Sequence, residues 1–153
     1  MTIILAIRIG EGSRAAADAA TKLAGQLGAE LRIVYVAKEL EAVAELASAA
    51  GQSEEEVRVR MMSEIRDRLR SEVGEELASD ARLVIVEGDV PKAVSRAAVD
   101  LEAELIIVGM RGRSALARLV LGDTTGAILE RAPCPVVVIP PAMTEGLSNH
   151  DRP

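Results

Sequence analysis

Five short runs of aliphatic residues, rich in β-branched side chains, recur along the chain and are separated by stretches with helical character. Nearly continuous apolar runs of this length are typical of strands buried on both faces, as in a parallel sheet. Strands that alternate with helices form right-handed parallel crossovers. The sequence therefore predicts an α/β fold, an open five-stranded parallel sheet with helices on both faces. The runs lie at 3–9, 30–37, 82–87, 104–109 and 135–140.

The connection between the second and third runs is the longest and has strong helix signals. Ser53 and Glu56 form a capping box. From Val57 to Leu77 apolar residues recur at every fourth position among Glu and Arg. We expect one long amphipathic helix here, lying on the sheet with its other face in solvent. The preceding segment, 38–52, is also expected to be helical.

Three other helices are expected to begin shortly after strands. Gly12 or Ser13 caps the first of them. Asp89 is the expected N-cap of another helix, with Pro91 in its first turn. The third covers 123–132. These positions place several helix N-termini at one edge of the sheet.

Length and charge restrict the classes of function. With 153 residues the chain has the size of one domain, which we place at 1–141, followed by a flexible tail at 142–153. Tyr35 is the only aromatic residue and the net charge is −6, so neither a basic stripe nor a stacking platform supports nucleic-acid binding. A lone Cys134, no signal peptide and no apolar run of about 20 residues predict a cytoplasmic protein without a membrane span.

Special residues follow the first and fourth strands. Ligands of such sheets bind beyond the carboxyl ends of strands, where the strand order reverses. After the fourth strand, Gly109 and Gly112 allow a sharp turn with bare backbone N–H groups. Gly122 then opens a helix, whose N-terminus favours an anion, and Thr124 and Thr125 add hydroxyls. Taken alone, the glycines are better explained as plain tight turns at the end of a strand.

The complete pattern is more specific. Gly109, two residues, Gly112, nine residues, Gly122, hydroxyl residues and then APCPVVVIP at 132–140 resemble the universal stress protein family. The resemblance covers nearly the whole chain. It implies the strand order 3-2-1-4-5 and a Rossmann-like fold of the adenine nucleotide alpha hydrolase type. It also implies a bound adenine nucleotide, ATP or AMP, with or without Mg²⁺.

The resemblance also implies roles for individual residues. The three glycines match the family's phosphate loop. Val36 matches an apolar residue near the adenine, and Thr125 matches a hydroxyl position in the last helix. Ile7 and Arg8, at the end of the first strand, complete the predicted nucleotide site together with Asp123 and Thr124.

Two residues of this site depart from the family pattern. Arg8 stands where nucleotide-binding members have Asp, and Asp123 stands where they have Ser or Thr. A carboxylate at 123 would repel phosphate. Three alternatives remain open: Asp123 caps the last helix, Mg²⁺ bridges Asp123 and phosphates, or Arg8 and Asp123 form an ion pair in place of the ligand.

Arginines beside the glycines add positive charge to the predicted loop. Arg111 and Arg113 either contact phosphates or are solvated, and both readings stay open. Arg118 is better explained as part of a solvated loop. No combination of nucleophile, base or metal ligands suggests catalysis, so an enzyme is not expected, although slow incidental ATP hydrolysis is not ruled out by the sequence.

The last strand is expected at the edge of the sheet, where an exposed apolar strand is rarely left bare. Family members pair this strand with its counterpart in a second subunit, so the resemblance implies a homodimer. The expected function is an adenine nucleotide-binding regulatory or stress-response module. The alternative is a dimeric interaction scaffold that binds no nucleotide. The predicted interface residues are Val136, Val137, Val138 and Ile139.

Overall fold

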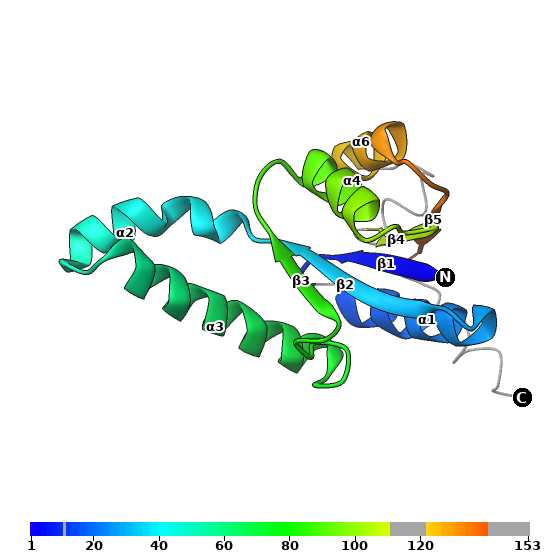
Figure 1. The fold of residues 1–153 in the computed structure, drawn as a ribbon, viewed down its shortest axis with the longest axis horizontal. Helices are drawn as coiled ribbons and strands as arrows, with labels where there is room; N and C mark the ends of the chain where they lie inside the picture. The colour runs from blue at the N-terminus through cyan, green and yellow to red at the C-terminus, as the bar shows by residue number, and fades with distance from the viewer. Residues whose placement is uncertain (11, 111–121, 141–153) are drawn as a thin grey trace, which may run out of the picture.

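The computed structural model describes residues 1–10, 12–110 and 122–140. Its centre is a five-stranded parallel sheet in the order β3-β2-β1-β4-β5, which confirms the predicted fold and strand order (Figure 1). Three predicted site residues, Arg111, Gly112 and Arg113, and the predicted tail lie outside the described residues. The strands are β1 (Thr2–Ile7), β2 (Glu30–Val36), β3 (Leu83–Val86), β4 (Leu105–Gly109) and β5 (Val136–Ile139).

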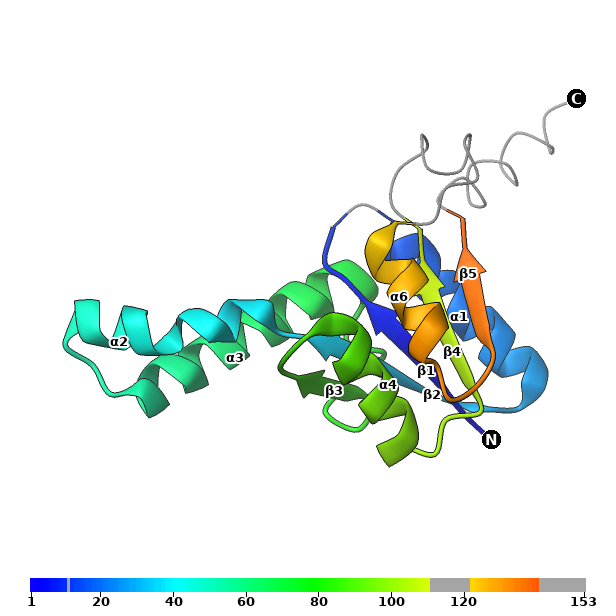
Figure 2. The same cartoon turned by 90° about the horizontal axis from the view of Figure 1, so that it is seen from above.

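Helices cover both faces of the sheet (Figures 1 and 2). Alternate side chains of a strand point to opposite faces. Ile3 and Leu5 of β1 therefore join the buried cluster beneath α1, while Ile4 joins the cluster beneath α4 and α6. The helices are α1 (Ser13–Leu27), the 3-10 helix η1 (Lys38–Ala42), α2 (Val43–Ala50), α3 (Glu54–Val73), α4 (Val90–Asp100) and α6 (Asp123–Arg131).

The helix α3 differs from the prediction. It ends at Val73 rather than continuing to Leu77, because Gly74 follows with φ of 90° and breaks the helical path. It also does not lie along the sheet. The antiparallel pair α2 and α3 projects beyond the sheet edge as an arm, and only the later part of α3 packs beside α1 (Figures 1 and 2). Ile65 and Leu69 are buried there, whereas Val59, nearer the tip, is 65% exposed.

The predicted helix caps are mostly confirmed. Ser53 accepts a hydrogen bond from the Glu56 backbone at 3.1 Å, and the capping box is complete. Asp89 accepts one from the Lys92 backbone at 3.3 Å, with a proline in the first turn. At α1 the N-cap is Gly12, which has no side chain to cap with. Within the part of the chain that the structure describes, no helix is long and apolar enough to cross a membrane.

Candidate functional site

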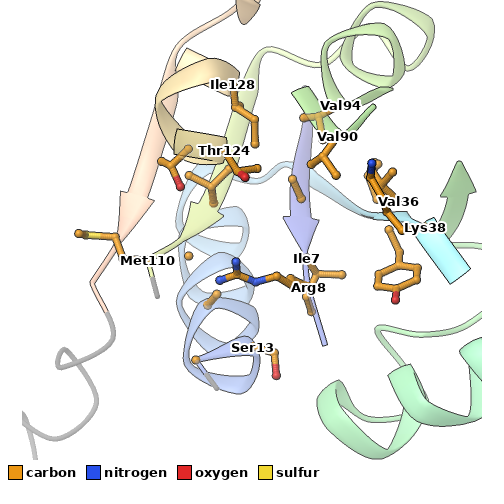
Figure 3. A pocket seen from close by; sticks show the side chains of 18 of the residues that line it. Ile7, Arg8, Ser13, Val36, Lys38, Val90, Val94, Met110, Thr124 and Ile128 are labelled. Atoms are coloured by element: carbon orange, nitrogen blue, oxygen red, sulfur yellow. The ribbon is translucent and has the colours of Figure 1, made fainter. Parts of the chain in front are cut away.

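A pocket of about 390 Å³ opens at the carboxyl edge of the sheet, where β1 and β4 are neighbours and the strand order reverses (Figure 3). Its walls come from the ends of β1, β2 and β4, from η1 and from the N-terminal parts of three helices, α1, α4 and α6. Chain segments far apart in sequence therefore meet at one site. This is the position at which sheets of this topology bind ligands.

One side of the pocket is lined mainly by aliphatic residues, with Lys38 beside them next to Val36 (Figure 3). Val34 and Val36 of β2 and Val90 and Val94 of α4 form this wall, next to Ala6 of β1. In Figure 3, Val36, Val90 and Val94 lie on the same side of the pocket, beyond Ile7. Aliphatic walls of this kind suit a flat, weakly polar group such as a nucleobase.

The other half is polar and favours negative charge. Gly109 and Met110 at the end of β4 face Thr124 and Thr125 in the first turn of α6. Helix N-termini carry unpaired N–H groups and the positive end of the helix dipole. Arg8 adds a cationic side chain between the two halves, at the end of β1 (Figure 3). The pocket thus combines an apolar compartment with an anion-favouring one.

The glycines of the motif serve different purposes. A Cβ on Gly109 would lie 3.2 Å from the Cβ of Ala16 in α1, a tight approach that would require β4 or α1 to move by a few tenths of an ångström, so packing favours glycine there. Gly122 has φ of −62° and no described atom within 4 Å of an added Cβ. Neither backbone conformation nor contact with the described residues requires glycine there. An open glycine beside the anion-favouring half is consistent with close approach of a ligand.

Most predicted site residues that the structure describes come together. The pocket lining includes Ile7, Arg8, Val36, Gly109, Thr124 and Thr125. Gly122 and Asp123 do not line it. They are exposed at the start of α6, directly before the lining threonines.

The structure does not support two of the three alternatives for Asp123, the helix cap and the ion pair with Arg8. Asp123 is the first residue of α6 and not its N-cap, which is Gly122, and no side chain caps this helix. Its charge still lies in the first turn, where the helix dipole favours an acid. No ion pair joins Arg8 to Asp123 among the ion pairs of the described residues. The idea that such a pair replaces the ligand is therefore not supported.

Four polar side chains of the pocket lining were not predicted as site residues from the sequence: Ser13, Tyr35, Lys38 and Glu39. The Tyr35 hydroxyl donates to Glu39, whose oxygens lie 2.9 and 3.0 Å away. Burial, with the hydrogen bond and negative charge of Glu39, raises the pKa of Tyr35 to about 12. A signal for two of them existed, because Lys38 and Glu39 follow the end of β2 as Arg8 follows β1.

The fold and pocket define an open α/β protein with a pocket at its topological switch point. A model of the universal stress protein family matches residues 1–140, and the chain belongs to this family.

Individual relatives agree with this assignment. A universal stress protein of Thermus aquaticus, encoded in the QAH/OAS sulfhydrylase 3′ region, is 34% identical over 56 residues, which are 37% of this chain and 41% of that protein. A universal stress protein of Mycobacterium tuberculosis is 50% identical over 38 residues, 25% of this chain and 13% of that protein. The matched stretches thus span less than half the length of these relatives.

Solved structures show the same fold. A universal stress protein in complex with cAMP has a TM-score of 0.56 and 21% identity, covering 91% of this chain and 95% of that chain. The UspA protein of Lactobacillus plantarum has a TM-score of 0.56 and 23% identity, with coverage of 91% and 97%. At these sequence identities the comparison establishes a shared fold only.

Proposed function

We propose that this universal stress protein binds an adenine nucleotide, ATP or AMP, in the pocket between β1 and β4, and acts as a regulatory module rather than as an enzyme. The observation that carries the proposal is the division of one pocket into an apolar half and an anion-favouring half at the switch point. The structural neighbour that holds cAMP supports an adenine nucleotide as the ligand class.

The lining residues suggest how the nucleotide lies. The base fits the aliphatic wall formed by Val36, Val90 and Val94. The phosphate fits the N-terminus of α6, beside the hydroxyls of Thr124 and Thr125. The ribose would then lie over the end of β1, next to Arg8. This orientation uses both halves of the pocket.

We further propose that the protein works as a cytoplasmic homodimer. The strand β5 lies at the edge of the sheet, paired with β4 on one side. A second copy of β5 would cover the other side by a two-fold interface. Binding of nucleotide and dimerisation are independent parts of the proposal, and each has its own test.

Thermal unfolding with AMP, ADP, ATP and cAMP, each with and without Mg²⁺, tests the nucleotide site. A ligand at a hundred times its dissociation constant should stabilise the protein by about 2.7 kcal/mol. Thr125→Val removes a lining hydroxyl and should reduce the shift. Thr21→Val is the matched control, because Thr21 lies on α1 away from the pocket and its hydroxyl donates to the Ala17 carbonyl at 2.8 Å.

The alternative function is a dimeric interaction scaffold that binds no nucleotide. The observation that favours it is the exposed carboxylate of Asp123 at the start of α6, next to the proposed phosphate position. No stabilisation by any of the four nucleotides would select this alternative. Stabilisation that Thr125→Val reduces and Thr21→Val leaves intact would select nucleotide binding.

A further inference from the structure

The helix α3 contacts the wall of the pocket through two side chains one helical turn apart, Arg68 and Glu72. Both residues lie in the later part of α3, which packs beside α1. Residues four positions apart occupy the same side of a helix. Each of the two reaches a different wall of the pocket.

The first contact joins Glu72 to Ser13. The Ser13 hydroxyl lies 2.7 Å from a Glu72 carboxylate oxygen and 2.8 Å from the Gly10 carbonyl oxygen. Because a hydroxyl has one proton, these two acceptors share a single donor. Ser13 is 5% exposed and lines the pocket at the first turn of α1. The Glu72 carboxylate therefore connects α3 to the first turn of α1, at the pocket wall.

The second contact joins Arg68 to Glu39 and, through it, to Tyr35. A guanidinium nitrogen of Arg68 lies 3.6 Å from a Glu39 oxygen. The same carboxylate accepts a hydrogen bond from the Tyr35 hydroxyl. Tyr35 and Glu39 both line the pocket at the end of β2. Glu39 belongs to η1, which leads directly into α2. The contact with Arg68 therefore also connects α3 to the segment from which α2 begins.

The position of Glu72 within α3 argues for a tertiary role. It lies in the last turn of the helix, where the negative end of the dipole disfavours a carboxylate. The helix dipole therefore does not stabilise this charge. The contact with Ser13, 59 residues away in sequence, accounts for its place.

We propose that Arg68 and Glu72 are positioning residues of the nucleotide pocket and that through them the pocket is coupled to the α2–α3 arm. The inference rests on the proposed nucleotide-binding function. A bound nucleotide contacts the walls that hold Ser13 and Glu39, so it restrains α3 through both contacts. Coupling between two sites acts in both directions, so a substitution that frees α3 from these walls should weaken nucleotide binding.

The binding test uses AMP and ATP with the full-length protein and compares pairs of variants. Glu72→Ala and Arg68→Ala should each weaken binding about fivefold or more. Glu64→Ala and Arg70→Ala are matched controls on α3: Glu64 is exposed and Arg70 pairs within the helix, with Asp67 at 3.4 Å. Both controls should bind as wild type. Glu72→Gln keeps an oxygen that accepts from Ser13 and should restore most of the affinity.

Hydrogen exchange provides a readout that a loss of stability alone would not reproduce. In the wild type, nucleotide should slow amide exchange along residues 43–73, although most of this arm lies away from the pocket. In the Arg68→Ala/Glu72→Ala double variant at saturating nucleotide, this protection should be lost while that of β1 and β4 remains.

The outcomes separate the two proposals. If wild type binds nucleotide and the Arg68 and Glu72 variants bind equally well, the coupling is refuted while nucleotide binding stands. Protection of the arm that persists in the double variant also overturns the coupling. If wild type binds neither AMP nor ATP, the proposed function fails and the coupling fails with it.

Discussion

Gly109 packs closely against Ala16: an added Cβ would lie 3.2 Å from the Cβ of Ala16, so a side chain at 109 would require β4 or α1 to shift slightly. The contact packs the end of β4 against α1 beside the pocket. Gly122, from the same sequence motif, has open space around it among the described atoms. The two glycines of one motif therefore occupy different environments, one closely packed and one open, and substitutions should affect them differently.

Gly109→Ala should destabilise the protein by about 1–2 kcal/mol, because overpacking forces β4 and α1 apart. Gly122→Ala should change the free energy of unfolding by less than about 0.5 kcal/mol, since a poorer N-cap is offset by a less flexible unfolded chain. Urea unfolding measures both. The second variant should nevertheless bind nucleotide more weakly, because its methyl group lies beside the proposed phosphate position. Equal stability losses in the two variants would contradict this account.

Asp123 should oppose binding of nucleotides with several phosphates. Its carboxylate is exposed, so its repulsion of a phosphate about 4 Å away is worth about 1 kcal/mol in water. We therefore expect Asp123→Ser to tighten ATP binding about fivefold and AMP binding less. Isothermal titration calorimetry at low and high salt measures the effect, which salt should reduce. An unchanged ATP affinity would show that Asp123 does not face the phosphates.

Arg8 and Asp123 should act independently on stability. Because no ion pair joins them among the described ion pairs, the unfolding free energies of Arg8→Ala and Asp123→Ala should add in the double variant to within about 0.5 kcal/mol. Urea unfolding of the wild type, the two single variants and the double variant measures this double-mutant cycle. A coupling energy well above that margin would restore the idea of an internal pair.

Tyr35 should make the protein less stable at high pH. Its pKa rises from 10.0 in the unfolded chain to about 12 in the folded protein, where burial and Glu39 disfavour the phenolate. The folded state thus holds its proton more tightly. The resulting stabilisation, about 2 kcal/mol, is complete below pH 10 and is lost as the pH rises through about 12.

Tyr35→Phe isolates this effect from the titration of other groups. Phenylalanine has no hydroxyl proton to lose, so the variant should show a smaller decrease in unfolding free energy over the same pH interval. Chemical unfolding followed by circular dichroism measures it. Identical pH profiles for wild type and variant would mean that Tyr35 does not have a raised pKa.

The edge of β5 should mediate dimerisation through its backbone. The Pro135 carbonyl accepts a hydrogen bond from Ile106 of β4 at 3.0 Å, and the Ile139 carbonyl accepts one from Met110, directly after β4, at 2.9 Å. By the two-residue period of a strand, the N–H groups of Val136 and Val138 point to the open edge. Val138→Pro removes one of these donors while sparing the bonds to β4. We expect it to convert the dimer into a monomer in light scattering, whereas Val138→Thr should stay dimeric. A monomeric wild type would refute the proposed dimer.

Local features were predictable because their causes lie within a few residues. The five strands follow from contiguous apolar runs. The capping box at Ser53 and the cap at Asp89 depend on partners three positions away. The strand order came from the family resemblance rather than from physical reasoning. Ile7 and Val36 end β1 and β2, and Arg8 directly follows β1. The strand order brings these strand ends together, and all three residues line the pocket.

Contacts between distant segments were decided by the tertiary structure. The amphipathic pattern of α3 predicted an apolar face but could not say which surface it covers, so its projection as an arm with α2 was missed. Gly109 was predicted as a ligand-binding glycine and lines the pocket, but its close packing against Ala16 depends on the tertiary structure. Ser13 and Glu72 are 59 residues apart, and neither has a local pattern that predicts the other. The sequence by itself determined the elements and their caps, which depend on neighbouring residues, whereas the pocket wall and its link to α3 depend on how those elements pack.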